Sequence, residues 1–273
     1  LLNRIRKIAP DVPIAVALDF HTQMTDAMIK GASIITGYRT YPHIDMADTY
    51  GPYVTNQIVR EALHPYPKHL VIVTKLGAKR GPQGTWEPAS SAKELRDAAE
   101  SNLENLGLDV LEVVNLRVMF SALEKKEGSI EEQMSVMLDL QREGKIQHIG
   151  LSHVTAKQVA EGRRMGEVVC VQNLYNIVRR EDDELIDDLA AANIPYVPFF
   201  PLGGFSPVQS ETLAKVAKQV GATPMQIAQA WLLRRSPNIL LIPGTSSLAH
   251  LRENLAVAMI ELPDDAMKAL DNL

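Results

Sequence analysis

The chain has 273 residues, 46% of them apolar, so it can bury a large core and has the usual size of a single α/β barrel domain. Its 28 basic and 33 acidic residues give a mildly negative net charge without a Lys/Arg cluster, which argues against nucleic acid or an anionic membrane as a partner. The single cysteine, Cys170, cannot support a disulfide framework, and no apolar run approaches the roughly 20 residues of a membrane span, so we expect a cytoplasmic protein.

Short apolar runs alternate with amphipathic stretches along the chain, which is the pattern of repeated βα units and a parallel sheet. The runs expected to form strands are 14–18, one within 33–46, 70–74, 110–116, 146–151, 168–172, 196–200 and 239–243. Two pieces, 34–38 and 43–46, compete for the second strand. Eight strands with helices between them predict a (β/α)₈ TIM barrel, and the missing GxGxxG motif after the first strand argues against an open doubly wound sheet.

The helices between these strands carry their own start signals. Three capping boxes are expected, namely Ser91 with Glu94, Ser129 with Glu132, and Thr155 with Gln158. A further helix is expected to begin at Thr223-Pro224, because proline suits the first helical position. After Ser91, the apolar stripe expected to face the barrel consists of Leu95, Ala98, Ala99, Leu103 and Leu106.

A proton-transfer site is predicted where the second and third strands end. Asp45 and Tyr50 come at and just after one apolar run, and Lys75 ends the next. On neighbouring parallel strands Asp45 and Lys75 would lie side by side, with Tyr50 above them. The ammonium would lower the phenol's ordinary pKa of about 10, and the carboxylate would keep the lysine charged. Tyr50 could then protonate a carbonyl oxygen as a hydride arrives at carbon, and Arg117 could donate to the same oxygen.

Other strand ends complete a polar rim. They carry Asn115, Ser152-His153, Gln172-Asn173, Phe199 and Gly244-Thr245. Taken singly, such residues have structural explanations: Lys75 can extend to solvent, Asp45 can cap a helix, and Gln172 can satisfy a buried backbone group. Arg117 can likewise form a surface salt bridge. Their convergence on one rim favours a functional site.

The loops after the last two strands predict a phosphate site. Residues 201–206 contain two glycines, and Gly244-Thr245-Ser246 opens a helix that carries His250 and Asn254. Barrels commonly bind phosphate here, because glycines let the backbone approach and helix N–H groups face an anion. A dinucleotide would explain both this site and the hydride chemistry. The alternative is a simple turn and helix cap.

From about residue 44 onward the sequence resembles the aldo-keto reductases. The match rests on HIDMADTYG at 43–51, VTK at 73–75, LGLD at 106–109, IGLS at 149–152, VQN at 171–173, PLG at 201–203 and IPGTSS with HLREN at 242–254. It is most similar to a bacterial branch that includes pyridoxal reductases. The resemblance implies Asp45, Tyr50 and Lys75 as catalytic residues, with Arg117 at the position of the usual histidine. It also implies NAD(P)H-dependent reduction of small aldehydes or ketones, with pyridoxal as the favoured substrate and no metal.

The resemblance also implies a set of cofactor contacts. These are Ser152, His153, Gln172, Phe199, Leu202, Gly203, Gly244, Thr245, Ser246, His250, Glu253 and Asn254. Ser152 and Gln172 fall where the family holds the nicotinamide carboxamide, while His153 replaces a usual asparagine. Gly244 and His250 replace a usual lysine and arginine, so NADP is expected and NAD stays open.

The first part of the chain instead resembles a fragment of the microcystinase-type zinc metallopeptidases. LDFHTQMT at 18–25 and GYRTYPHIDMADT at 37–49 carry this similarity, and Asp19, His21 and His43 would be the metal ligands. We therefore expect an atypical segment over 1–43 that supplies the first βα unit and a reductase barrel over 44–273. The alternatives are a zinc hydrolase fragment and an inactive hybrid barrel.

Overall fold

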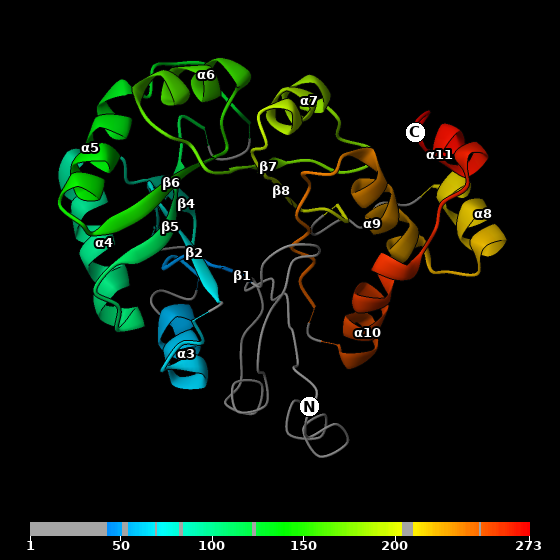
Figure 1. Cartoon of the computed structure of the whole chain (residues 1–273), viewed down its shortest axis with the longest axis horizontal. Helices are drawn as coiled ribbons and strands as arrows, with labels where there is room; N and C mark the ends of the chain where they lie inside the picture. Colours follow the sequence, from blue (N-terminus) through cyan, green and yellow to red (C-terminus); the bar gives the residue numbers. More distant parts are fainter. Residues whose placement is uncertain are drawn as a thin grey trace. The chain divides into compact units, whose positions relative to one another are not determined.

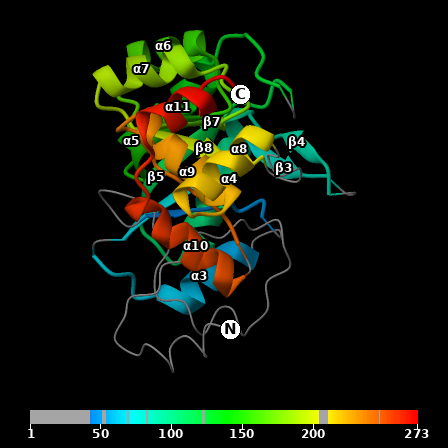
Figure 2. The same ribbon diagram turned by 90° about the vertical axis from the view of Figure 1, so that its right-hand side faces the viewer.

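The computed structural model describes residues 43–50, 54–68, 70–81, 84–121, 124–203, 210–245 and 247–273. These residues belong to two compact units, 43–172 and 173–273 (Figures 1 and 2). The expected first strand at 14–18, the competing piece at 34–38, and Asp19 and His21 lie outside the described residues. The atypical first unit and its boundary at 43/44 therefore stay predictions.

The first unit confirms the predicted alternation of strands and helices. Its elements are β1 His43–Asp45, α3 Val54–Leu63, β2 Val71–Leu76, β3 Ala78–Arg80, β4 Trp86–Pro88, α4 Ala92–Leu106, β5 Leu111–Arg117, α5 Glu131–Arg142, β6 Ile146–Ser152, α6 Ala156–Met165 and the start of β7 Val171–Leu174. The strands β1, β2, β5, β6 and β7 pair in that order, all in parallel. The piece at 43–46 thus supplies a sheet strand, β1.

Most residues of β2, β5 and β6 are buried, on both faces of the sheet, which explains their largely apolar sequences. Successive side chains of a strand point to opposite faces. In β5, Val114 and Leu116 are fully buried, and helices α4 and α5 lie along one side of the strands (Figure 1). On the other face Val73, Val113 and Cys170 form an apolar cluster. Polar residues follow this cluster along the same face toward the carboxyl ends of the strands.

Two of the three predicted capping boxes form. Ser91 with Glu94 begins α4, and Thr155 with Gln158 begins α6, each with both reciprocal hydrogen bonds. The prediction of a box between Ser129 and Glu132 is wrong, since Ile130 is the N-cap of α5 and makes no side-chain capping bond. The carboxylate of Glu161 from α6 takes this place and accepts from the N–H of Ile130.

The second unit contains the end of β7 and the remaining helices. Its other elements are α7 Asp183–Ala191, β8 Tyr196–Phe199, α8 Glu211–Val220, α9 Pro224–Arg235, α10 Leu248–Ala256, the 3₁₀ turn η1 Val257–Met259 and α11 Asp264–Leu270. The helix expected at Thr223-Pro224 is confirmed as α9, with Thr223 as its N-cap. None of the described helices in either unit is long and apolar enough to cross a membrane.

The eighth strand predicted at 239–243 does not form as a strand. Ile239 makes a single parallel bridge with Tyr196 of β8, in which Tyr196 N donates to Asn238 O and Leu240 N donates to Tyr196 O, both at 2.9 Å. The next bond of a parallel ladder would come from the N–H of residue 198. Residue 198 is proline, which has no N–H, so the ladder stops after one bridge.

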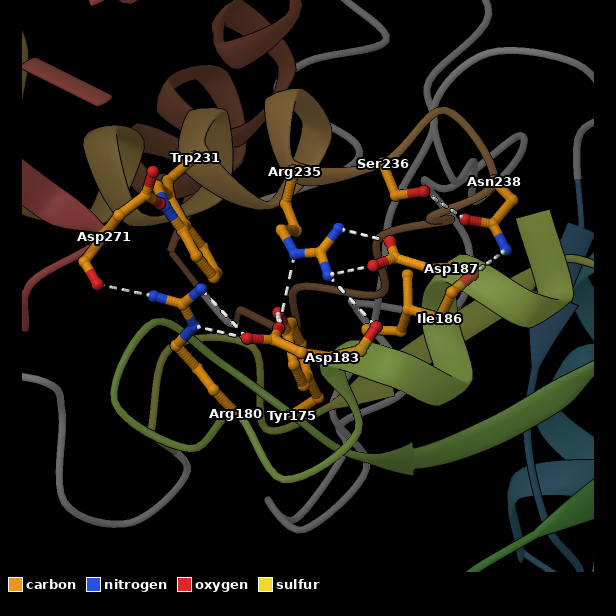
Figure 3. A network of polar contacts seen from close by, with 10 residues as sticks. All are labelled: Tyr175, Arg180, Asp183, Ile186, Asp187, Trp231, Arg235, Ser236, Asn238 and Asp271. Atoms are coloured by element: carbon orange, nitrogen blue, oxygen red, sulfur yellow. Dashed lines mark hydrogen bonds and ion pairs between the residues drawn. The ribbon is translucent and has the colours of Figure 1, made fainter. Parts of the chain in front are cut away.

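A polar network joins α7, α9 and the end of the chain within the second unit (Figure 3). Arg235 reaches both carboxylate oxygens of Asp187 at 2.7 and 3.1 Å and the backbone oxygen of Asp183 at 3.0 Å. The indole of Trp231 donates to Asp271 at 2.8 Å, and Arg180 lies 5.1 Å over the Trp231 ring. These contacts join α9 to α7 and to Asp271, which directly follows α11.

Candidate active site

Asp45 and Lys75 form a buried ion pair at adjacent strands. β1 and β2 are parallel neighbours, and Asp45 lies opposite Val73, two residues before Lys75. The ammonium of Lys75 binds Asp45 Oδ1 and also donates to the backbone oxygen of Met46 at 3.0 Å. Only 6% of the Lys75 side chain and 10% of the Asp45 side chain are exposed. A buried ammonium needs such a partner to remain charged, so the pair is mutually stabilised.

Tyr50 lies beside this pair, in the turn that leads from β1 toward α3. Its backbone N–H donates to Ala47 O at 3.1 Å, and Thr55 Oγ1 donates to Tyr50 O at 2.7 Å, which fixes the backbone of the turn. The Lys75 ammonium lies 5.8 Å from the centre of the Tyr50 ring. The predicted trio of Asp45, Tyr50 and Lys75 is thus brought together.

Arg117, the last residue of β5, completes the group. Its guanidinium carbon lies 5.5 Å from the ring of Trp86, and its Nε donates to Met119 Sδ at 3.3 Å. Burial lowers the pKa of Arg117, while Tyr50 and Asp45 act in the opposite direction. Arginine keeps its charge in proteins, so a fixed cation faces Tyr50 and Asp45.

Three of these side chains, those of Tyr50, Lys75 and Arg117, line one pocket. It is lined by Ala47, Thr49, Tyr50, Lys75, Ala78, Trp86 and Arg117. Trp86 belongs to an antiparallel hairpin, β3 with β4, and meets Tyr50 edge to face at 6.0 Å. Arg80 of the same hairpin stacks 3.8 Å over Trp86 and donates to Thr49 O at 3.3 Å. This hairpin was not predicted from the sequence, although Gly81 and Gly84 are a turn signal between its strands.

Three further predicted residues lie in β6 and β7 or directly after β6. Ser152 is fully buried, and its hydroxyl oxygen has no hydrogen-bond partner among the described residues. Gln172 is also fully buried and donates through Nε2 to Asp45 Oδ2 at 2.6 Å. His153 has a backbone φ of 60°, and its Nε2 lies 3.2 Å from Glu124 O. Burial and the charge of Arg117 lower the pKa of His153.

The remaining predicted cofactor contacts belong to the second unit. Phe199 ends β8 and meets Phe200 edge to face at 5.5 Å, and Leu202 and Gly203 follow them. Gly203 has a φ of 92°, a conformation that suits glycine. Its N–H donates to Phe200 O at 3.0 Å.

The other contacts of this unit gather around the start of α10. Thr245 Oγ1 accepts from the N–H of the helix cap Ser247 at 3.0 Å, and Gly244 precedes it. Asn254 accepts from Gln229 Nε2 at 2.6 Å, which orients its amide. His250 is exposed and Glu253 half-buried on the same helix. Ser246 lies outside the described residues.

A second buried polar cluster lies beside the trio and was missed from the sequence. Asp48 is 8% exposed, and burial raises its pKa to about 6 against the hydrogen bonds from Thr49 and Asn102. Asn102 of α4 also accepts from Asn56 Nδ2 at 2.9 Å and from Thr74 Oγ1 at 2.8 Å. The cluster therefore ties the turn that carries Tyr50 to β2 and to two helices.

Comparisons with known proteins decide the family. The model of the aldo/keto reductase family matches residues 25–273. Pyridoxine 4-dehydrogenase of Escherichia coli strain K12 is 60% identical over 232 residues, which cover 85% of this chain and 81% of the relative. The chain belongs to the aldo/keto reductase family. An uncharacterised oxidoreductase of Schizosaccharomyces pombe is 36% identical over 229 residues, 84% of this chain and 73% of that protein.

Solved aldo/keto reductases share the fold. A thermostable aldo-keto reductase in complex with the inhibitor epalrestat matches with a TM-score of 0.70 at 29% identity, covering 84% of this chain and 81% of that one. The Klebsiella pneumoniae enzyme in complex with NADP and acetate matches with a TM-score of 0.72 at 20% identity, covering 95% and 90%. The predicted (β/α)₈ barrel class and an NAD(P)-dependent oxidoreductase that reduces carbonyl groups are thereby confirmed.

The zinc alternative gains nothing from the described part of the chain. Within it, no group of His, Cys, Asp and Glu side chains could hold a metal ion. Asp19 and His21 are not described, nor is the side chain of His43. The metallopeptidase-like fragment therefore stays a prediction, whereas the reductase family is established.

Proposed function

We propose that this aldo/keto reductase reduces pyridoxal to pyridoxine with NADPH and catalyses the reverse oxidation. The 60% identity to E. coli pyridoxine 4-dehydrogenase supports the substrate. The observation that carries the chemistry is a pocket lined by Tyr50, Lys75 and Arg117, in which Lys75 is held by a buried ion pair with Asp45. We also propose a cytoplasmic location, which the free and buried thiol of Cys170 supports.

Each of the four side chains has a defined role in this proposal. Bound NADPH supplies the hydride. Tyr50 delivers a proton from its hydroxyl to the carbonyl oxygen of the substrate, and Lys75 stabilises the phenolate that remains. Asp45 balances the charge of Lys75 and holds it in place. Arg117 donates to the same oxygen as negative charge develops there, in a pocket where burial strengthens the interaction.

The residues present fit a nicotinamide dinucleotide. The buried hydroxyl of Ser152 has an unused hydrogen-bonding capacity at the carboxyl end of β6, and a carboxamide would satisfy it. In the second unit, the aromatic ring of Phe199 would contact the nicotinamide ring. The phosphates would be bound by the backbone around Gly203, Gly244 and Thr245, and by Ser246, which the sequence predicts as a further contact. His250, Glu253 and Asn254 would contact the adenosine end. NADP is the proposed cofactor, and NAD is the competitor to test.

The Tyr50→Phe variant tests the proposal. Purified protein is given pyridoxal with NADPH or NADH, and cofactor absorbance is followed. We expect wild-type turnover with NADPH and a loss of at least about 100-fold in Tyr50→Phe, because the proton donor is removed. NADPH should still quench the fluorescence of Trp86 in the variant.

The matched control is Tyr66→Phe, which removes a hydroxyl that donates to Leu106 O at 2.7 Å. This control should retain turnover. Full activity in Tyr50→Phe would refute the acid assignment. An absence of pyridoxal reduction by the wild-type protein would refute the substrate.

A further inference from the structure

A row of buried hydrogen bonds leads away from the Asp45 carboxylate. Gln172 Nε2 donates to Asp45 Oδ2 at 2.6 Å, and Asn115 Nδ2 donates to Gln172 Oε1 at 3.3 Å. Cys170 Sγ in turn donates to Asn115 Oδ1 at 3.2 Å. Gln172 is 0% exposed, Asn115 1% and Cys170 9%, so water does not compete for these bonds.

The direction of every bond in the row is set by the carboxylate. An ionised carboxylate only accepts, so the Gln172 amide must present its NH₂ to Asp45 and its oxygen to Asn115. Asn115 must then present its NH₂ to Gln172 and its oxygen to Cys170. A thiol is the remaining donor, and burial raises the pKa of Cys170 to about 12, which keeps the proton on sulfur. Each member therefore fixes the orientation of the next.

The sheet provides space for this row at one glycine. Asn115 lies opposite Lys75 on one side and opposite Gly150 on the other. A Cβ added at Gly150 would lie 2.0 Å from Asn115 Oδ1 and 2.6 Å from Cys170 Sγ. Both atoms are packed in the row, so neither can move away without breaking a hydrogen bond. The absence of a side chain at 150 is what lets Asn115 occupy this position.

We propose that Asn115 is a positioning residue that orients the Gln172 amide, and through it Asp45, toward Lys75. The inference rests on the proposed function of Asp45 and Lys75. It assigns to Gln172 a structural duty beside any contact with the nicotinamide. Neither Asn115 nor the direction of the row follows from the family resemblance.

Replacement of Asn115 by leucine, which has a similar size and no hydrogen-bonding group, tests the proposal. We expect kcat to fall roughly 10-fold to 100-fold, the range for losing a hydrogen bond that acts on a charged group. The Kd of NADPH, measured by fluorescence quenching, should change less than kcat, because Asn115 itself is not a predicted cofactor contact and Gln172 is only one of them. An unchanged kcat, or a weaker NADPH affinity with an unchanged kcat, would overturn the proposal.

The matched control is Val114→Ala, in the same strand with its side chain on the opposite face. It removes buried apolar volume but no member of the row, so it should lower stability and leave kcat near wild type. A double-mutant cycle adds Gln172→Leu. If the row acts as a unit, Asn115→Leu should cost nothing further in the Gln172→Leu background. Additive losses would contradict the proposal.

A crystal structure of Asn115→Leu gives a readout that needs no substrate. We expect Gln172 Nε2 to leave hydrogen-bonding distance of Asp45 Oδ2. A Gln172 amide that keeps its place would overturn the positioning role, whatever the enzyme reduces. An inactive wild-type protein, in contrast, would count against the proposed substrate alone.

Discussion

Asp48 shows how a single buried carboxyl group can affect stability beside an active site. It is 8% exposed, and burial raises its pKa to about 6. The folded state therefore binds this proton more tightly than the unfolded chain does. The contribution of Asp48 to stability is full below its unfolded pKa and is lost as the pH rises through about 6.

We expect the Asp48→Asn variant to remove this pH dependence. At about pH 8 wild-type Asp48 is ionised, and a pKa rise of about two units corresponds to about 3 kcal/mol of lost stability. Asparagine keeps an acceptor for the N–H of Thr49 without a charge. The variant should be more stable than the wild type by up to that amount at about pH 8, and the difference should vanish near pH 4. Urea denaturation at several pH values measures it.

The control for this prediction is Asp109→Asn, at an exposed position of the same unit. It should show the pH dependence of the wild type. A stability difference between Asp48→Asn and wild type that stays constant from about pH 4 to pH 8 would contradict the assignment of the titration to Asp48.

At the residue scale, the sequence predicts the Asp45, Tyr50, Lys75 and Arg117 cluster because strand ends converge whatever their spacing along the chain. The Asp48 cluster escapes the same reasoning. Asn102 interrupts the buried stripe of α4 between Ala99 and Leu106, and a polar residue in such a stripe finds its partners only in the folded chain. The row from Cys170 to Asp45 also joins residues from separate strands, so periodicity does not reveal it.

At the element scale, the start of α5 shows why a capping motif alone is not decisive. Glu161 of α6 accepts from the backbone N–H of Ile130 at 3.0 Å and from the hydroxyl of Ser129 at 2.5 Å. These hydrogen bonds lower the pKa of Glu161. Glu132, which the local sequence favours, is exposed. A carboxylate from the next helix has replaced the local one.

Variants of Glu161 and Glu132 test which of the two carboxylates caps α5. We expect Glu161→Ala to lower the free energy of unfolding by about 1 kcal/mol, the usual value of a helix cap. Glu132→Ala should change it by less than about 0.5 kcal/mol, as exposed positions do. Thermal or urea denaturation of both variants measures the difference. A larger loss of stability in Glu132→Ala than in Glu161→Ala would show that Glu132 forms the cap, as the local sequence predicts.

Strand prediction at this scale succeeds or fails according to hydrogen-bonding capacity. The runs that became β2, β5 and β6 lie in the expected places because their residues can pair on both sides. The run at 239–243 is equally apolar, but Pro198 in its neighbour β8 lacks the next donor. Apolar character predicts burial, whereas a strand also needs a partner with free backbone groups.

For the whole molecule, the fold class and the family follow from motifs that lie between residues 43 and 254, and the family model matches residues 25–273. The sequence before residue 43 carries none of these motifs. The predicted metallopeptidase-like fragment overlaps the reductase motifs at residues 43–49, so the sequence alone leaves the boundary open. The second unit presents a different case. The sequence predicts where its helices α9 and α10 begin, yet the charged contacts between α7 and α9, shown in Figure 3, join positions about 50 residues apart.

Arg235 is the centre of that network, and its removal should destabilise the second unit. Its side chain is 16% exposed and binds Asp183 and Asp187, so Arg235→Met leaves two carboxylates without their shared cation. Asp187 is 63% exposed, and solvent can therefore compensate part of the loss. We expect a decrease of about 2 kcal/mol in the free energy of unfolding, less than the roughly 3–5 kcal/mol of a fully buried pair.

The neighbouring Arg234 supplies the matched control. It lies 3.5 Å from Asp264, with 61% and 86% of the two side chains exposed, and exposed pairs contribute little. Trp231 is fully buried in the second unit, and the other tryptophan, Trp86, lies in the first. In a Trp86→Phe background the emission of Trp231 therefore reports unfolding around Arg235. We expect the urea midpoint to fall for Arg235→Met and to stay unchanged for Arg234→Met. Arg235, unlike Arg234, joins α9 to α7. Equal midpoints for the two variants would show that the network contributes no net stability.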